Sequence, residues 1–142
     1  THQFGNGVPI NLTEAVKWYR KAAEQGFLTA QFNFATMHSI GEGMPKNNKK
    51  AFKWFRLAAE QGHASSQAAI GKMYEKGESV PKDIVAAHAW YGVAASAYGY
   101  PDGKKEMSRV AKGMSSEQVA KAKDLTKELR KQIKQNTEKS HK

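Results

Sequence analysis

Two stretches of sequence that lie 36 residues apart decide the fold: AVKWYRKAAEQG at residues 15–26 and AFKWFRLAAEQG at residues 51–62. A weaker third copy, AHAWYGVAASAY, follows after the same interval. Trp18, Trp54 and Trp90 fix the period, because a tryptophan stands at the same place in each copy. Self-similarity at a fixed period of about 20–50 residues is typical of repeat proteins, in which each copy packs on the next.

Each period contains a first helix and a loop. The first helix is expected over residues 29–40 and again over residues 65–76, where aromatic and aliphatic side chains recur at a spacing of four. Loops are expected at 41–47 and 77–83, because glycine favours turn conformations and proline blocks continuation of a helix.

A second helix then completes each period. Asn11, Asn47 and Asp83 occupy the expected N-cap positions, where a short side-chain oxygen accepts a hydrogen bond from an unpaired amide. Gly26 and Gly62 are expected to end the first two of these helices, since glycine adopts the left-handed conformation without a steric penalty. The chain is therefore predicted to be all-α.

Beyond residue 100 the period ends but helical signals continue. Asp102 is expected to cap a short helix that extends to about Lys112. Ser115 and Gln118 form a capping-box pattern that opens a final helix reaching about Gln135. Apolar residues recur along it every three or four positions, so one stripe should cover the last repeat while a lysine-rich face meets water. The stripe consists of Val119, Ala122, Leu125, Leu129 and Ile133.

Composition limits the classes of function. The 142 residues, of which 39% are hydrophobic, suffice for one domain or a short repeat array, and are too few for a multidomain enzyme. The absence of cysteine excludes disulfides, cysteine-bound metals and thiol nucleophiles. The mean hydropathy is −0.71 and no apolar run is long enough for a membrane span, so a soluble segment is expected. Because it begins with Thr1 and shows no leader pattern, a processed or excised piece is expected.

The charge of the chain is basic and unevenly placed. Lysine and arginine number 23 against 13 aspartates and glutamates, and residues 103–142 hold 12 of the basic and 5 of the acidic side chains. Such a surplus indicates either a site for an anionic partner, such as nucleic acid or an envelope polymer, or simply a solvated helix face. The candidate anion-binding residues are Lys121, Lys123, Lys127, Arg130, Lys131 and Lys134.

No pattern in the sequence indicates an active site. The five histidines form no cluster at metal-ligand spacing, and Glu24 and Glu60 recur with the period as repeat features. We therefore expect neither a catalytic residue nor a metal or other cofactor. Inter-repeat packing explains the periodic tryptophans better than a stacking ladder for bases or sugars, because alanine pairs accompany them.

One stretch resembles a known repeat family. It reads A-Q-F-N-F-A-x-M-H-x-x-G-x-G-M-P-x-N…A-F-K-W-F-x-x-A-A-E-Q-G between Ala30 and Gly62, and it resembles the Sel-1-like repeat (SLR) family, relatives of tetratricopeptide repeats. Ala35, His38 and Ser79 depart from the family pattern, which prefers glycine, tyrosine and glycine there. The resemblance implies a right-handed α/α superhelix with a C-terminal capping helix.

The resemblance also implies the domain organisation. The second half of a truncated repeat is expected at 1–27, full repeats at 28–63 and 64–99, and a helical cap with a basic tail at 100–142. Because the first helix of the truncated repeat is missing, Phe4, Trp18 and Tyr19 should expose apolar surface. An upstream repeat or a second copy could cover it.

Finally, the resemblance implies a scaffold or adaptor that binds a partner protein or peptide. Periplasmic or secreted bacterial settings are typical of the family. By analogy with tetratricopeptide repeats, the partner should bind the concave face formed by the first helix of each repeat. The residues expected on that face are Thr29, Phe32, Thr36, Ser39, Ser65, Ala68, Lys72 and Glu75.

Overall fold

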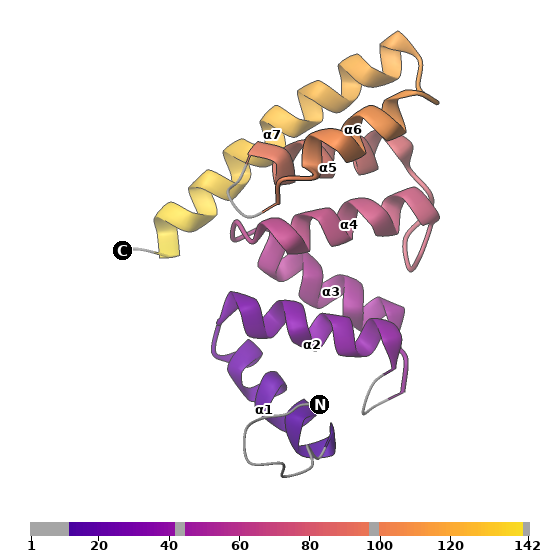
Figure 1. Cartoon of the computed structure of the whole chain (residues 1–142). Helices are drawn as coiled ribbons and strands as arrows, with labels where there is room; N and C mark the ends of the chain where they lie inside the picture. Colours follow the sequence, from indigo (N-terminus) through magenta and orange to yellow (C-terminus); the bar gives the residue numbers. More distant parts are fainter. Residues whose placement is uncertain (1–11, 42–44, 97–99, 141–142) are drawn as a thin grey trace. The chain divides into compact units, whose positions relative to one another are not determined.

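The computed structural model describes residues 12–41, 45–96 and 100–140, and these residues form seven helices and no strand (Figure 1). The predicted all-α class is therefore confirmed. In chain order the helices are α1 (Leu12–Glu24), α2 (Leu28–Ile40), α3 (Asn48–Ala59), α4 (Ala64–Lys76), α5 (Ile84–Ser96), α6 (Gly103–Ala111) and α7 (Ser116–Ser140).

The chain divides into two compact units. Unit 1 comprises the residues up to Trp54, and unit 2 comprises Phe55–Lys142. Helix α3 contributes to both, because its first part, 48–54, belongs to unit 1 and its last part, 55–59, to unit 2.

The core of unit 1 lies between α1 and α2. Ala23 and Phe34 are buried there, and Tyr19 and Trp54 pack against them. The small alanine lets the two helices approach closely. In addition, the buried Gln31 donates a 3.1 Å hydrogen bond from Nε2 to the carbonyl oxygen of Ala23. This bond gives that carbonyl a second donor, because it also accepts from the Gly26 amide at 3.0 Å in the turn after α1.

Unit 2 repeats the same helix pairing and builds its core around α5. The buried Gln67 donates from Nε2 to the carbonyl oxygen of Ala59 over 3.1 Å, as Gln31 does one period earlier. Every residue of α5 from Ala86 to Ala94 is buried, and the helix packs against α4, α6 and α7. A helix that is apolar all round is stable in water only when neighbours cover each of its sides.

The predicted starts of the second helices are confirmed where the structure describes them. The Lys50 amide donates to Asn47 Oδ1 and the Ala86 amide to Asp83 Oδ1, each over 3.0 Å. Asn11 lies outside the described residues. The first helices start one residue earlier than expected, at Leu28 and Ala64.

The predicted helix ends at Gly26 and Gly62 are also confirmed, since both glycines have a φ of 98° in the left-handed region. Only glycine adopts this conformation without steric cost.

The expectation that the Asp102 side chain caps α6 is wrong. Asp102 precedes the helix, but its side chain makes no capping hydrogen bond. Its backbone, at φ −84° and ψ 1°, is not in the extended conformation from which a capping side chain reaches the amides of the first turn. The helix ends at Ala111, and the Gly113 amide donates to the carbonyl of Val110.

The capping box of α7 is confirmed, and the helix is longer than expected. The Gln118 amide donates to Ser115 Oγ over 3.1 Å, and the Ser115 amide donates to Gln118 Oε1 over 2.9 Å. Helix α7 continues to Ser140 instead of ending near Gln135, because no glycine or proline interrupts it.

The apolar stripe of α7 packs against α5 as expected, with Ala122 and Leu129 buried (Figure 1). Asn136 lies on the distal part of the same helix, and its Nδ2 donates to the carbonyl of Glu60 over 3.1 Å. The helix thus contacts both α5 and the residue that follows α3.

Helix α6 begins in very close contact with α5. A Cβ atom added to Gly103 would lie 2.5 Å from Cα and 2.6 Å from Cβ of Ala95. Real side chains do not approach a backbone so closely, so α6 would have to move away from α5. Gly103 is therefore required by packing.

We expect Gly103→Ala to destabilise the protein by about 1–3 kcal/mol, because the added methyl group overpacks the α5–α6 contact. Gly113→Ala is the matched control: its φ is not positive and its Cβ would meet nothing closer than 3.9 Å. The control should stay within about 0.5 kcal/mol of wild type. Urea denaturation followed by circular dichroism measures both. Equal effects of the two substitutions would contradict the packing argument.

Glu75 joins α4, α5 and α6 in one hydrogen-bonded network. Its carboxylate accepts two hydrogen bonds from the Arg109 guanidinium, at 2.6 and 2.8 Å, and a third from the buried Tyr91 hydroxyl at 2.8 Å. Arg109 also contacts Glu106 at 3.1 Å. The hydrogen bonds from Arg109 outweigh desolvation and lower the pKa of Glu75 to about 2.

This network predicts a loss of stability in acid. The carboxylate of Glu75 stabilises the folded state above its unfolded pKa, and this contribution is lost as pH falls toward about 2. We expect Glu75→Gln to cost about 1 kcal/mol at neutral pH, a value reduced because Arg109 is half-exposed. The difference from wild type should shrink at pH ~2.5. Glu117→Gln, which removes an exposed 3.7 Å ion pair, is the control and should change little at either pH.

Candidate functional site

The four candidate partner-binding residues of unit 1 share one side of α2. Thr29 is exposed, while Phe32, Thr36 and Ser39 are half-buried. Their spacing places them opposite the side that packs into unit 1, where Phe34 is buried. The Thr36 hydroxyl donates to the backbone carbonyl of Phe32 over 2.9 Å, so its hydrogen is satisfied within the helix.

The exposed face of α2 continues to the end of the helix. Ile40 is one turn beyond Thr36 and has 60% of its surface exposed. A large apolar side chain at this exposure adds to the hydrophobic area that Phe32 contributes on the same face. Ile40 was not among the residues expected on this face, because its spacing alone does not distinguish it from a core position.

The four candidates of unit 2 differ from one another in their surroundings. Lys72 is exposed and Ser65 is half-buried. Ala68, in contrast, is only 3% exposed, and Glu75 is bound to Arg109 and Tyr91. Of this set, Lys72 and Ser65 are therefore the side chains of α4 that remain accessible to a partner.

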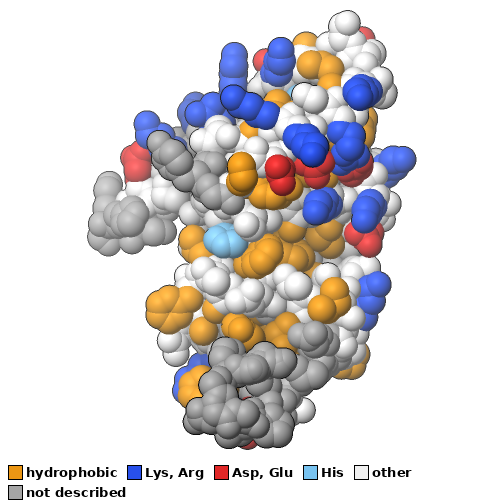
Figure 2. Space-filling model, viewed as in Figure 1, with side chains coloured by type: hydrophobic (Ala, Val, Ile, Leu, Met, Phe, Trp, Pro, Cys, Tyr) orange, Lys and Arg blue, Asp and Glu red, His pale blue; other side chains and the backbone are white. Residues whose placement is uncertain are grey.

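The candidate anion-binding residues all lie exposed on α7. Figure 2 shows Lys and Arg side chains gathered over the part of unit 2 formed by α6 and α7. Lys121 is 3.7 Å from Glu117, a distance typical of a weak surface ion pair. No described residue forms an ion pair with Lys123, Lys127, Arg130, Lys131 or Lys134.

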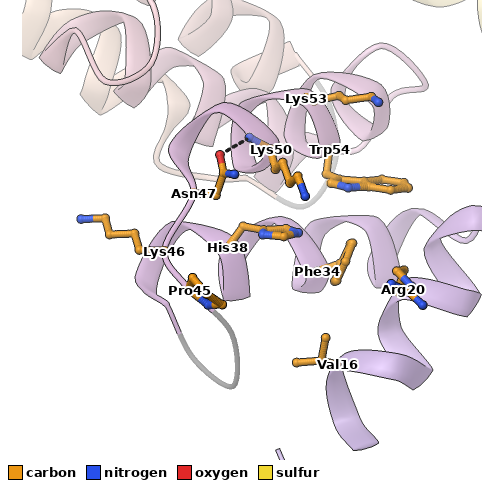
Figure 3. A pocket seen from close by; sticks show the side chains of 10 residues that line it. All are labelled: Val16, Arg20, Phe34, His38, Pro45, Lys46, Asn47, Lys50, Lys53 and Trp54. Carbon is orange, nitrogen blue, oxygen red and sulfur yellow. Dashed lines mark hydrogen bonds between the residues drawn. The ribbon is translucent and has the colours of Figure 1, made fainter. Parts of the chain in front are cut away.

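Unit 1 also contains a pocket that the sequence analysis missed. It has a volume of about 520 Å³ and lies between α1, α2 and the start of α3 (Figure 3). Phe34 and Trp54 form part of its wall, with their ring centroids 5.4 Å apart in an edge-to-face contact. Apart from the neutral polar Asn47, basic and apolar side chains make up the lining: Val16, Arg20, Phe34, His38, Pro45, Lys46, Asn47, Lys50, Lys53 and Trp54.

His38 is the buried polar group of this pocket. Its ring contacts Phe34 with centroids 4.6 Å apart, and Figure 3 shows the Lys50 side chain directed toward it. Burial, and secondarily the charge of Lys50, lower the pKa of His38, so its ring is neutral at pH 7. Its Nδ1 is buried and has no hydrogen-bond partner among the described residues.

The two described histidines of unit 2, His63 and His88, have structural surroundings. The His63 side chain caps α4, because its Nδ1 accepts from the Ser66 amide at 3.3 Å and lies 2.7 Å from the Ser66 hydroxyl. His88 is buried in α5, and burial lowers its pKa. Within the described ranges, no three His, Asp or Glu side chains gather closely enough to hold a metal ion.

The tryptophans differ strongly in exposure. Trp90 is 2% exposed, as packing between repeats predicts, and Trp54 is partly buried beside Phe34. Trp18 is 69% exposed, as expected, whereas Tyr19, which was expected to be exposed with it, is half-buried against the core of unit 1. Phe4 lies outside the described residues, and self-association through this edge stays a prediction.

None of the described helices combines the length and apolar character needed to span a lipid bilayer.

A comparison with curated proteins yields no match. Among solved structures, one similar chain is a protective antigen present in uropathogenic Escherichia coli strains that displays an SLR fold. It is 30% identical with a TM-score of 0.84, and the match covers 92% of this chain and 28% of that one. Another is a Sel1 repeat protein from Oxalobacter formigenes, 38% identical with a TM-score of 0.70, matched over 77% of this chain and 44% of that one.

This chain thus spans less than half the length of either solved relative. The family model of the Sel1 repeat matches residues 1–27, 28–63 and 64–98, and the helices of this chain form the SLR fold of the solved structures. The chain therefore belongs to the Sel1 repeat family.

Proposed function

We propose that this protein is an interaction scaffold that binds a partner protein or peptide on the exposed faces of α2 and α4. The observation that carries the proposal is the accessible stripe on α2, in which Phe32 and Ile40 flank Thr36. Apolar side chains next to hydroxyl groups on an accessible side of a helix are suited to a protein partner.

Lys72 and Ser65 supply the corresponding accessible groups on α4. Polar and charged side chains of this kind are typical of the rim of a protein interface. Ala68 is too buried to contribute, and Glu75 contributes only if a partner displaces Arg109. The proposed binding residues are thus Thr29, Phe32, Thr36, Ser39 and Ile40 on α2, with Ser65 and Lys72 on α4.

A pull-down from an extract of the source organism tests this proposal. We expect the wild-type protein to retain a partner at both ~50 and ~300 mM salt. A variant that combines Phe32→Ala with Lys72→Glu should lose that partner. Removing an aromatic anchor and reversing a charge should weaken binding at least tenfold, roughly the effect of one hot-spot residue. The matched control combines Phe27→Ala and Lys82→Glu, which alter an exposed phenylalanine and lysine outside these faces. Equal loss in both double variants would contradict the proposal.

A second candidate function is electrostatic binding of nucleic acid or an anionic envelope polymer along α7. It is favoured by the exposure of all six basic residues of the predicted set, five of which have no ion-pair partner among the described residues. Against it, Asp124 and Glu128 lie on the same helix and dilute the charge, and no aromatic side chain accompanies the lysines for stacking.

Salt dependence tests this second function. The affinity for a labelled 20-base-pair duplex, measured by fluorescence anisotropy, should fall steeply between about 50 and 200 mM salt if lysines neutralise phosphates. Combining Lys127→Glu with Lys131→Glu should then reduce the slope of log K against log salt by about 2, because each phosphate contact contributes about 0.9. An affinity that does not change with salt would eliminate this function.

A further inference from the structure

The pocket of unit 1 is basic as well as aromatic. Arg20, Lys50 and Lys53 line it from α1 and α3, and no carboxylate is among its described lining residues. Figure 3 shows Lys50 directed toward His38, whereas Lys46 extends away from the other side chains. Three cations therefore border a cavity whose wall also includes Phe34 and Trp54.

The charge of Lys50 is unfavourable for the helix that carries it. Lys50 lies in the first turn of α3, where the aligned peptide dipoles already create positive potential, and that turn contains no acidic residue. One period earlier the same position is Glu14, in the first turn of α1, and one period later it is Ala86. The stability of the helix therefore does not explain a lysine at this position.

The next repeat uses its equivalent residues differently. Arg56, one period after Arg20, lies 5.1 Å above the ring of Trp90 and forms a 2.8 Å ion pair with Glu60. Its guanidinium also contacts the Tyr74 hydroxyl at 3.5 Å. These contacts partner the cation within the protein itself.

Arg20 has no such partners. It forms no hydrogen bond or ion pair with any described residue, and His38 replaces the tyrosine that would offer a hydroxyl. Lys50 and Lys53 stand where the next repeat has Ala86 and Ala89. This pocket consequently holds positive charge that no described residue of unit 1 pairs.

We propose that the pocket binds an acidic segment of a partner protein that carries an apolar side chain between its carboxylates. The apolar side chain lies against Phe34 and Trp54, while Asp or Glu carboxylates pair with Arg20, Lys50 and Lys53. The volume of about 520 Å³ is within the range of about 300–1,000 Å³ that holds a compact ligand, which fits a few residues of peptide. The inference rests on the proposed scaffold function and specifies the chemistry of one partner segment.

The lining favours a peptide over a nucleic acid. Proteins that bind single strands offer successive aromatic surfaces on which bases stack. Here Phe34 is in edge-to-face contact with both Trp54 and His38, so the rings pack on each other. Val16 and Pro45 add aliphatic surface, which suits an apolar side chain better than a polar base edge.

The test uses Lys50→Glu in the full chain and reads binding and stability together. The probe is a fluorescein-labelled peptide of six glutamates around two central phenylalanines. At ~150 mM salt Lys50→Glu should weaken its binding about tenfold or more, because an attractive charge becomes repulsive. The same substitution should raise the melting temperature, since an acid then faces the start of α3. A role confined to folding would not produce these opposite changes.

Lys49→Glu is the matched control. Lys49 is in the same exposed first turn but does not line the pocket. This variant should also raise the melting temperature, yet weaken peptide binding less than about threefold, because salt screens exposed charges beyond about 8 Å. A peptide with glutamine in place of glutamate should not bind.

Several outcomes would overturn the inference. One is that the peptide does not bind wild type, or that Lys50→Glu and Lys49→Glu weaken its binding equally. Another is that Lys50→Glu lowers the melting temperature. A third is that a dT8 oligonucleotide binds at the pocket more tightly than the peptide. Failure of the acidic-segment proposal is distinguishable from failure of the scaffold function. If only the acidic-segment proposal fails, wild type still retains the partner from the extract, and the variant changed at Phe32 and Lys72 still loses it.

Discussion

A buried glutamine side chain sets the geometry of each helix pair. Gln31 and Gln67 each donate to the carbonyl of an alanine eight residues earlier, across the turn made by a left-handed glycine. The bond fixes the start of the second helix against the end of the first, and its acceptor carbonyl also accepts from the glycine amide of the turn. A glutamine that lost this acceptor would leave its buried side-chain amide unsatisfied, so the pairing has few alternatives. The alanines then allow the close approach that brings Phe34 and Trp54 together in unit 1.

The parts of the fold that depend on local chemistry could be predicted from sequence. The period located the helix pairs, and the caps at Asn47 and Asp83 were recognisable because a capping side chain bonds to amides only three residues away. Asp102 has the same residue type as Asp83 but a different backbone conformation. That conformation is set where α6 meets α5 at Gly103, a tertiary contact that residue type alone does not reveal.

The candidate surfaces were less predictable, because they depend on partners far apart in sequence. Glu75 was expected on a binding face, but Arg109, 34 residues later and outside the repeats, pairs with it. The pocket was not predicted from the sequence for a different reason. The repeat pattern identifies residues that recur, whereas the pocket depends on Lys50, a lysine at a position that is occupied by the acid Glu14 one period earlier. Departures from a repeat are informative once the structure shows which of them share a cavity.

The contact between α7 and the start of unit 2 has a consequence for synthesis. Asn136 bonds to the carbonyl of Glu60, and Ala122 and Leu129 cover α5. On the ribosome, α7 emerges after every other helix of unit 2. Until it does, one side of the apolar helix α5 lacks its cover and is open to non-native association. Unit 1, whose described core lies between α1, α2 and Trp54, needs none of these residues. The core of unit 2 therefore stays incomplete until its last helix has been made, whereas the described core of unit 1 consists of residues made earlier.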